Sequence, residues 1–255
     1  MSSISVVIPV FNVGSIIKDC LQSVEWADEL VCIDMGSTDN TMVVCKEQGV
    51  NLLKNIPKNY NFDINRKLGM INARGEWILK IDSDDRLTKK LQKSIKAAIK
   101  GKGSIVGYNL FNRVFFFNRE IKYGMKKRNS SELRLFKKKS WIYNPFKFHQ
   151  LIRVKGNTDY LEGNYLHFNS QSIREFINKM NLYTDLDAGK DSSLGKKASF
   201  LHLIISPIVK FIKIYIINLG LLDGAYGLIV SMLYAFYNFT YKLKIFEKKS
   251  FNLWV

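Results

Sequence analysis

The first hundred residues alternate short apolar runs with segments whose apolar positions recur every three or four residues. The apolar runs predict β-strands at 4–9, 30–34, 50–53 and 77–81. Helical spacing is found in the segments between and after them, at 15–24, about 40–48, 62–73 and 88–100. Strands that alternate with helices in this way predict an α/β fold with a mostly parallel sheet.

The second half of the chain has a different pattern. Residues 104–166 contain short β-like runs that are broken by basic loops. A capping box at 172–175 then begins a helix. Residues 188–197 have the composition of a polar linker, and 198–241 are apolar and rich in aromatic residues. The sequence therefore predicts an α/β domain over 1–170 and a helical region over 171–255.

The net charge of +17 is distributed unevenly along the chain. Residues 1–109 carry +3, 110–155 carry +11, 156–195 carry −3 and 196–255 carry +6. Such basic patches favour a polyanion, which means membrane phosphates, a phosphorylated glycolipid or nucleic acid. A solvated, lysine-rich surface would give the same charge. The aromatic residues form no RNA-binding signature, so we expect no nucleic-acid partner.

Two features favour a cytoplasmic location. The first residues lack the basic stretch and long apolar run of a signal peptide. The three cysteines have no metal-ligand spacing, and their odd number fits a reducing compartment better than a set of disulfides.

Candidate ligand residues follow three of the predicted strands. They lie at 9–12, at Asp34 and at 82–85, where the carboxyl ends of strands in an open α/β sheet bind ligands. Asp34 is placed to hydrogen-bond a nucleoside. Asp82 and Asp84 flank one residue, so an extended backbone would point both carboxylates to the same side. Paired carboxylates suit Mg²⁺ or Mn²⁺, although many such pairs are helix caps or surface turns. The Gly-rich motifs of dinucleotide-binding and P-loop proteins are absent from the sequence.

Three motifs carry a resemblance to a known family: SVVIPVFN at 5–12, IDMGSTD at 33–39 and GEWILKIDSDD at 75–85. They resemble the family 2 glycosyltransferases of GT-A fold, a Rossmann-like architecture. The chain is most similar to the small bacterial branch that adds glucose to the inner core of lipopolysaccharide or lipooligosaccharide. Further similarity lies in ELRLF at 132–136, LHF at 166–168 and GLLDG at 220–224, so the resemblance covers nearly the whole chain.

The resemblance implies roles for individual residues in a nucleotide-sugar-binding and catalytic domain. The nucleoside site would be lined by Pro9, Val10 and Asp34. Arg66 would lie near the base or the diphosphate. Asp82 would contact the donor, and Asp82 and Asp84 would hold Mg²⁺ or Mn²⁺. Arg134 is a candidate for the diphosphate or the acceptor, with a plain charge at a sheet edge as the alternative.

The catalytic base is where this chain departs from the family pattern. The family tends to have His-Glu where this chain has His149-Gln150, and an amide cannot accept the proton of the acceptor hydroxyl. The candidates for the base are therefore His149, Asp85 and Glu132; the alternatives are an offset alignment and impaired activity. His167 is interpreted as a structural residue, and His202 is interpreted as part of an interfacial helix.

The apolar region near the end of the chain predicts contact with a membrane. Residues 198–218 contain an interior proline and two lysines, and 224–241 form an uncharged run close to the shortest that can span a bilayer. The aromatic content and the flanking lysines favour helices that lie in the interface. A transmembrane hairpin and a helical pair that is buried in a core or a dimer are the alternatives.

These patterns lead to one predicted function and two alternatives. The prediction is an inverting transferase that moves a hexose, glucose by resemblance, from a UDP-sugar to a membrane glycolipid acceptor. It would work as a peripheral protein on the inner face of the bacterial cytoplasmic membrane, against an anionic surface. One alternative is a nucleotidyltransferase, which should begin with a Gly-rich phosphate loop that 8–12 lack. The other is a degenerate, non-catalytic fold that binds membranes or polyanions.

Overall fold

The computed structural model describes residues 2–55, 62–101, 103–125, 131–142, 152–195 and 199–251. The chain forms two compact units. The first consists of Met1–Asn112 and Ser131–His167, and the second of Arg113–Ser130 and Phe168–Val255. Residues 113–130 thus group with the C-terminal helices. The functional division at residue 170 stays a prediction.

The parallel half of the sheet has the strand order β3-β2-β1-β4. Its strands are β1 (Ile4–Val10), β2 (Glu29–Asp34), β3 (Asn51–Lys54) and β4 (Trp77–Lys80). All seven residues of β1 are buried, as expected of a parallel strand that is covered on both faces. The four strands predicted from apolar runs are confirmed as this half of the sheet.

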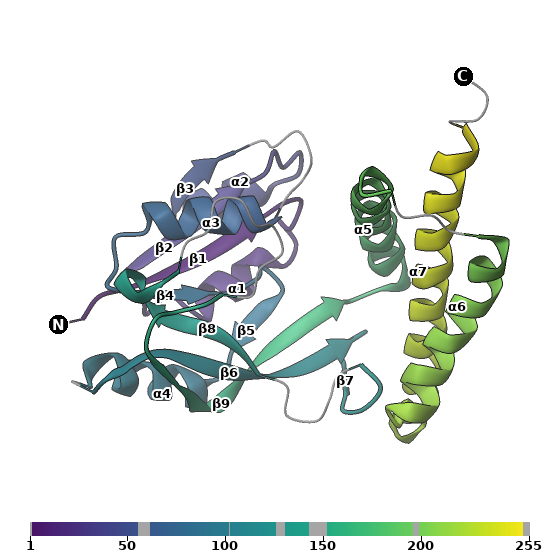
Figure 1. Cartoon of the computed structure of the whole chain (residues 1–255). Helices are drawn as coiled ribbons and strands as arrows, with labels where there is room; N and C mark the ends of the chain where they lie inside the picture. The colour runs from purple at the N-terminus through teal and green to yellow at the C-terminus, as the bar shows by residue number, and fades with distance from the viewer. Residues whose placement is uncertain are drawn as a thin grey trace. The chain divides into compact units, whose positions relative to one another are not determined.

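The sheet continues beyond β4 in the order β8-β6-β9-β5, and β7 pairs with β6. These strands are β5 (Asp85–Leu87), β6 (Ile105–Phe116), β7 (Arg119–Ile121), β8 (Ser131–Lys137) and β9 (Asn157–Ser170). The pairs β4–β8, β8–β6, β6–β7 and β5–β9 are antiparallel. The predicted α/β class is confirmed, and the sheet is mixed because the antiparallel strands extend its parallel half (Figure 1).

Helices α1 (Ile17–Gln22), α2 (Thr41–Glu47) and α3 (Phe62–Asn72) lie beside the parallel strands (Figure 1). Helix α4 (Lys89–Lys100) follows β5 and lies against β9. Thr88 caps α4 by accepting a hydrogen bond from the backbone N–H of Leu91. Gly69 lets α3 approach the sheet closely, because a Cβ there would lie 2.3 Å from a methyl carbon of Ile33.

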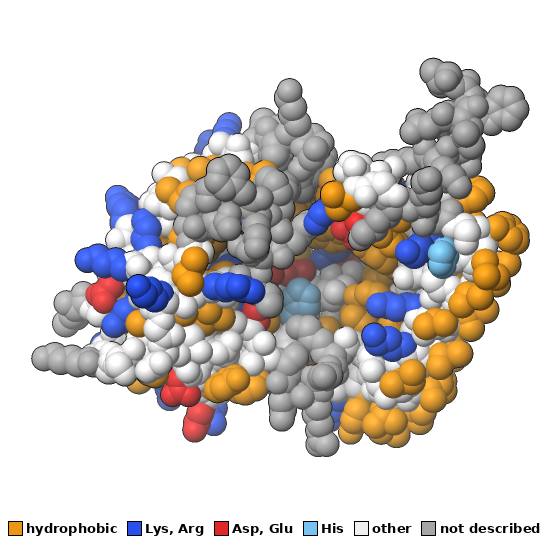
Figure 2. Space-filling model, viewed as in Figure 1, with side chains coloured by type: hydrophobic (Ala, Val, Ile, Leu, Met, Phe, Trp, Pro, Cys, Tyr) orange, Lys and Arg blue, Asp and Glu red, His pale blue; other side chains and the backbone are white. Residues whose placement is uncertain are grey.

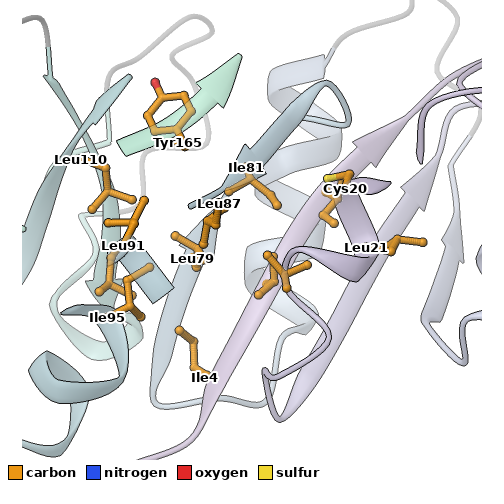
Figure 3. Packing of buried hydrophobic residues seen from close by; sticks show 14 of the residues in the cluster. Ile4, Cys20, Leu21, Leu79, Ile81, Leu87, Leu91, Ile95, Leu110 and Tyr165 are labelled. Carbon is orange, nitrogen blue, oxygen red and sulfur yellow. The ribbon is translucent and has the colours of Figure 1, made fainter. Parts of the chain in front are cut away.

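The core lies on both faces of the sheet, because successive side chains of a strand point to opposite faces. Ile4, Val6 and Ile8 of β1 belong to the larger cluster, and Val7 belongs to the smaller one. In Figure 3 the larger cluster joins side chains of the strands, such as Leu79, to side chains of helices α1 and α4. This core fixes the strand ends from which the candidate site is built.

The second unit contains the C-terminal helices. They are α5 (Ile173–Ser193), α6 (Phe200–Ile212), a π-helical turn (Lys213–Ile217), a 3-10 turn (Gly220–Asp223) and α7 (Gly224–Phe251). The predicted cap is confirmed in part: Ser172 accepts from the N–H of Glu175, but the carboxylate of Glu175 accepts from the N–H of Gln171, whereas in a capping box it would accept from that of Ser172. The predicted linker at 188–197 is wrong, because α5 continues to Ser193. Ala188 lies in this polar stretch and is buried in one cluster with Ile245 of α7. This packing stabilises α5 through residues that have the composition of a linker.

Two C-terminal segments, Phe200–Ile217 and Gly220–Glu247, are long and apolar enough to cross a membrane. Length and composition alone make this weak evidence for spanning, but the helices are apolar enough for membrane association.

Candidate active site

The carboxyl ends of the parallel strands bring the predicted nucleoside residues together. Val10 of β1 lies opposite Asp34 of β2 in the strand register, and Pro9 precedes it. The carboxylate of the buried Asp34 accepts hydrogen bonds from the backbone N–H groups of Gly36 and Ser37, each at 3.2 Å. Asp34 therefore shapes the turn after β2. The nucleoside contacts of Pro9, Val10 and Asp34 stay predictions.

The acidic segment begins where β4 ends, beside the same strands. Val7 of β1 lies opposite Lys80 of β4, and the N–H of Ile81 donates to the carbonyl of Val7 at 3.2 Å. Residues 82–84 then leave the sheet, and Asp85 begins β5. The register of the parallel strands therefore places the three segments that follow β1, β2 and β4 at the same edge of the sheet. Their positions in the sequence predict this arrangement.

Asp85 is the centre of the acidic segment, and its side chain is fully buried. Its Oδ2 accepts from the guanidinium of Arg134 at 2.5 Å and from the backbone N–H of Asp82 at 2.9 Å. Its Oδ1 lies 2.9 Å from Nδ1 of His167, which faces it because β5 pairs with β9 in this register. Burial raises the pKa of Asp85, but Arg134 and His167 lower it further, so its net pKa is below the usual value. Asp85 is thus an ionised carboxylate that orients its neighbours.

Asp82 is held by two arginines. Its Oδ1 accepts from Nη2 and Nε of Arg66 at 2.5 and 3.2 Å. Its Oδ2 lies 3.4 Å from Nη2 of Arg134. Burial would raise the pKa of Asp82, yet these guanidinium groups hold it well below its usual range. In this arrangement both predicted donor-site arginines contact the same carboxylate.

Arg134 lies inside the sheet, because β8 runs between β4 and β6. The alternative of a charge at a sheet edge is therefore wrong. Besides Asp85 and Asp82, its guanidinium contacts Glu132 at 3.0 Å and lies over the ring of Tyr165 at 4.2 Å. Its burial is compensated by these partners. Its role toward diphosphate or acceptor stays a prediction.

Glu132 faces a second cation. Its Oε1 accepts from Nζ of Lys80 at 2.6 Å, and its side chain keeps 30% of its surface exposed. Burial raises the pKa of Glu132, but Arg134 and Lys80 bring it below its usual value. A carboxylate stabilised in this way is a weak proton acceptor. His149 and Gln150 lie outside the described residues.

His167 joins the candidate site, although the sequence interpretation treated it as structural. Its Nδ1 lies 2.9 Å from Asp85 Oδ1 and 3.4 Å from Asp84 Oδ1. Burial lowers the pKa of His167, but Asp84 and Asp85 raise it more, to about 9. The signal for this role was LHF at 166–168, but the pairing of β5 with β9 could not be derived from it. His202 instead lies in the first turn of α6, where it bonds to Ser199.

Asp84, Asp85 and His167 form a group that could hold a metal ion, because one ligand atom from each lies within 4.8 Å of the others. Carboxylate oxygens suit Mg²⁺ and Mn²⁺, and an imidazole nitrogen favours the softer Mn²⁺. The donor set therefore fits a divalent cation. It differs from the predicted pair in that the carboxylate of Asp82 is occupied by the two arginines.

Comparison with known proteins gives one family. The model of "Glycosyl transferase family 2" matches residues 5–163. A lipopolysaccharide core biosynthesis glycosyltransferase, LpsC of Rhizobium meliloti, is 28% identical over 245 residues, which cover 93% of this chain and 89% of LpsC. An uncharacterised glycosyltransferase of Rickettsia felis is 25% identical over 276 residues, covering 97% of this chain and 90% of the relative.

Among solved structures, the chain matches TarS of S. aureus, at 19% identity and a TM-score of 0.47. The match covers 72% of this chain but only 39% of TarS. Glucosyl-3-phosphoglycerate synthase of Mycobacterium tuberculosis, solved with Mn²⁺, UDP and phosphoglyceric acid, matches at 21% identity and a TM-score of 0.37. That match covers 45% of this chain and 43% of the synthase.

Proposed function

The chain belongs to glycosyl transferase family 2, and we propose that it is an inverting hexosyltransferase that moves glucose from a UDP-sugar to a membrane glycolipid. The acceptor we propose is the core of lipopolysaccharide or lipooligosaccharide, and the similarity to LpsC of Rhizobium meliloti supports it. The protein would act as a peripheral protein on the cytoplasmic face of the membrane. The observation that carries the proposal is the cluster of carboxylates, arginines and His167, which lies where the parallel strand β4 ends in the mixed sheet.

The donor would lie across the edge of the parallel strands. Pro9, Val10 and Asp34 would contact the nucleoside. Arg66 and Arg134 supply positive charge beside Asp82, where a diphosphate would need it. Guanidinium groups that are already held in place stabilise the charge of the leaving diphosphate without reorganisation.

A divalent metal, with Mn²⁺ preferred to Mg²⁺, would be held by Asp84, Asp85 and His167. When bound, such a metal supplies a Lewis acid for the departing diphosphate. In this chain Asp85 contributes by fixing Arg134 and His167 at the same time.

His149 is the proton acceptor that we propose for the acceptor hydroxyl. The buried, ion-paired states of Asp85 and Glu132 make them weaker bases, because their pKa values lie below the usual ones. Gln150 would orient the hydroxyl by hydrogen bonding.

A panel of nucleotide sugars with Mn²⁺ or Mg²⁺, read by thermal unfolding, tests the donor and the metal together. A ligand at about 100 times its Kd stabilises the protein by about 2.7 kcal/mol, which raises Tm by about 5–11 °C for a chain of this size. We expect this with UDP-sugars and metal, and expect it to vanish in Asp84→Asn. The exposed Asp159→Asn is the matched control. Equal stabilisation by any nucleotide without metal would contradict the proposal.

A further inference from the structure

Helices α6 and α7 carry an extensive exposed apolar face. Of the 26 large hydrophobic side chains that are exposed in the described residues, 18 lie between Phe200 and Leu243. Each of these 18 exposes between 36% and 69% of its surface. Figure 2 shows hydrophobic side chains, with lysine and arginine among them, gathered where Figure 1 places these helices. Contiguous exposed apolar faces are rare on monomeric soluble proteins and mark sites that contact a partner or a membrane.

The face is continuous because the two helices pack against each other. Ser206 of α6 donates to the side chain of Asn238 of α7 at 2.6 Å. Leu203 and Ile214 on one segment and Val230 on the other are buried. The exposed large hydrophobic residues of α7 recur every three or four positions from Ile229 to Leu243, so they form one stripe along the helix.

We propose that the α6–α7 face docks into one leaflet of an anionic bilayer, with both helices lying in the plane of the membrane and neither crossing it. Charge favours this occupant: residues 196–255 carry a net +6, and Lys213, in the π-helical turn that extends α6, is exposed within the apolar segment. Lysines bury their alkyl chains beside apolar surface and keep the ammonium group among lipid phosphates. The proposal adds a docking geometry to the membrane partner of the proposed function, and it does not require the transfer reaction.

Length alone does not decide between lying in the membrane and crossing it. The 18 residues of Phe200–Ile217 extend over ~27 Å at ~1.5 Å per residue, close to the ~30 Å of a hydrocarbon core. The in-plane and the transmembrane arrangements differ in where they place the polar segments that are attached to each end of the helix pair.

The turn between α6 and α7 is bonded to β7 and the residues that follow it. The side-chain amide of Asn218 donates to the carbonyl of Gly124 at 2.7 Å, and the N–H of Gly124 donates back at 2.9 Å. The carboxylate of Asp223 accepts from the N–H groups of Lys122 and Tyr123 at 3.0 and 2.9 Å. A transmembrane hairpin would have to carry this turn, and the polar strand bonded to it, to the far side of the bilayer.

The opposite end of α7 is bonded to the acidic helix α5. Tyr237 donates to the carboxylate of Asp187 at 3.1 Å, and Tyr241 donates to that of Asp191. If α7 crossed the membrane, these carboxylates would enter hydrocarbon, which excludes them strongly. Both ends of the helix pair are therefore attached to polar parts of the same unit, and the in-plane arrangement keeps both in water.

Depth-dependent quenching on the full-length protein tests this geometry. The three native cysteines, Cys20, Cys32 and Cys45, are buried, so Ile208→Cys can be labelled selectively with an environment-sensitive fluorophore. Vesicles of phosphatidylethanolamine and phosphatidylglycerol at 3:1 carry a quencher either near the headgroups or near the bilayer centre. We expect stronger quenching by the shallow quencher. Stronger quenching by the deep quencher would overturn the in-plane proposal.

Matched variants test the face itself. Ile208 is 54% exposed on α6 and Val43 is 56% exposed on α2. We expect Ile208→Asp to lower the partition coefficient onto these vesicles about tenfold, because it replaces one inserted aliphatic side chain with a charge. Val43→Asp should bind like the wild type. Equal binding of both variants, or no vesicle binding by the wild type while UDP-sugar turnover persists, would overturn docking and leave the proposed reaction standing.

The competing occupant is a second copy of this chain. Light scattering on the lipid-free protein distinguishes the two. A monomer that binds vesicles supports the proposal, and a stable dimer that Ile208→Asp dissociates would overturn it.

Discussion

Replacement of Arg134 by methionine should destabilise the first unit strongly. Arg134 is only 5% exposed, and its guanidinium pairs with Asp85, Glu132 and Asp82 at 2.5, 3.0 and 3.4 Å. Methionine has a similar length but no charge, so Arg134→Met leaves two or more carboxylates buried near one another without their shared cation. Removing one partner of a buried ion pair costs about 3–5 kcal/mol, which corresponds to a fall in Tm of about 6–20 °C for a chain of this size.

The loss of stability in Arg134→Met should depend on pH, and the pKa shifts of its carboxylate partners give the direction. The net pKa values of Asp85 and Glu132 lie below the usual ones, although burial opposes this, because Arg134 stabilises their ionised forms. Groups with lowered pKa values stabilise the fold above their unfolded pKa, about 4, and lose this contribution as pH falls through the folded value. Without Arg134, its guanidinium no longer offsets the effect of burial, so the pKa values of both carboxylates should rise, although His167 still lowers that of Asp85 and Lys80 still lowers that of Glu132. The gap in stability between wild type and variant should therefore be largest near pH 7 and narrow below about pH 4.

Urea unfolding followed by circular dichroism between pH 3.5 and 7.5, with chelator present, measures this gap. The control is Arg113→Met, which removes a bidentate partner of Glu120 from a pair whose arginine side chain is 45% exposed. An exposed pair contributes about 0–1 kcal/mol. Arg134→Lys, which keeps the charge and loses the planar fork, should be intermediate and guards against a variant that does not fold. Equal, small losses in Arg134→Met and Arg113→Met would refute the reasoning.

Three further predictions concern packing, the donor and the base. Gly69→Ala should cost about 1–3 kcal/mol in urea unfolding, because its Cβ would lie 2.3 Å from a side chain of β2, whereas Gly103→Ala has nothing within 4 Å and should be neutral. Asp34→Asn should raise KM for the UDP-sugar, with kcat nearly unchanged, in steady-state kinetics; an unchanged KM would remove Asp34 from the nucleoside site. His149→Ala should lower turnover about 10²–10⁴-fold and Gln150→Glu should raise it at neutral pH. Rates of both variants across pH check this, and a wild-type profile for His149→Ala would exclude the imidazole.

The parallel half of the fold could be predicted because local pattern determines it. β1 was predicted at 4–9 and forms Ile4–Val10, and the helix predicted at 88–100 forms Lys89–Lys100. The strand-end positions of Asp34 and the 82–85 segment followed from the same pattern. Apolar runs and helical spacing indicate strands and helices from residues that are close together in the sequence.

The antiparallel half, and with it part of the site, depends on contacts that sequence spacing does not encode. His167 reaches Asp85 only because β5 pairs with β9 in one register, across 82 positions of the chain. Arg134 is buried because the sheet continues past β8 to β6. The sequence shows only that the residue is charged, and a charge at a sheet edge was therefore the alternative interpretation. The C-terminal part of α5 was interpreted as a linker because it is rich in polar residues. In the structure these polar side chains have partners on α7, such as Tyr241 for Asp191.

The most direct test of the central claim is the product formed from UDP-glucose, Mn²⁺ and a core glycolipid acceptor, analysed by chromatography of the nucleotides and mass spectrometry of the lipid. We predict that UDP accumulates in step with an acceptor that gains one hexose. We also predict that excess chelator or Asp84→Asn lowers the rate at least ~100-fold, since the metal contributes several kcal/mol to the transition state. Release of inorganic diphosphate in place of UDP, or an undiminished rate in chelator, would contradict the claim.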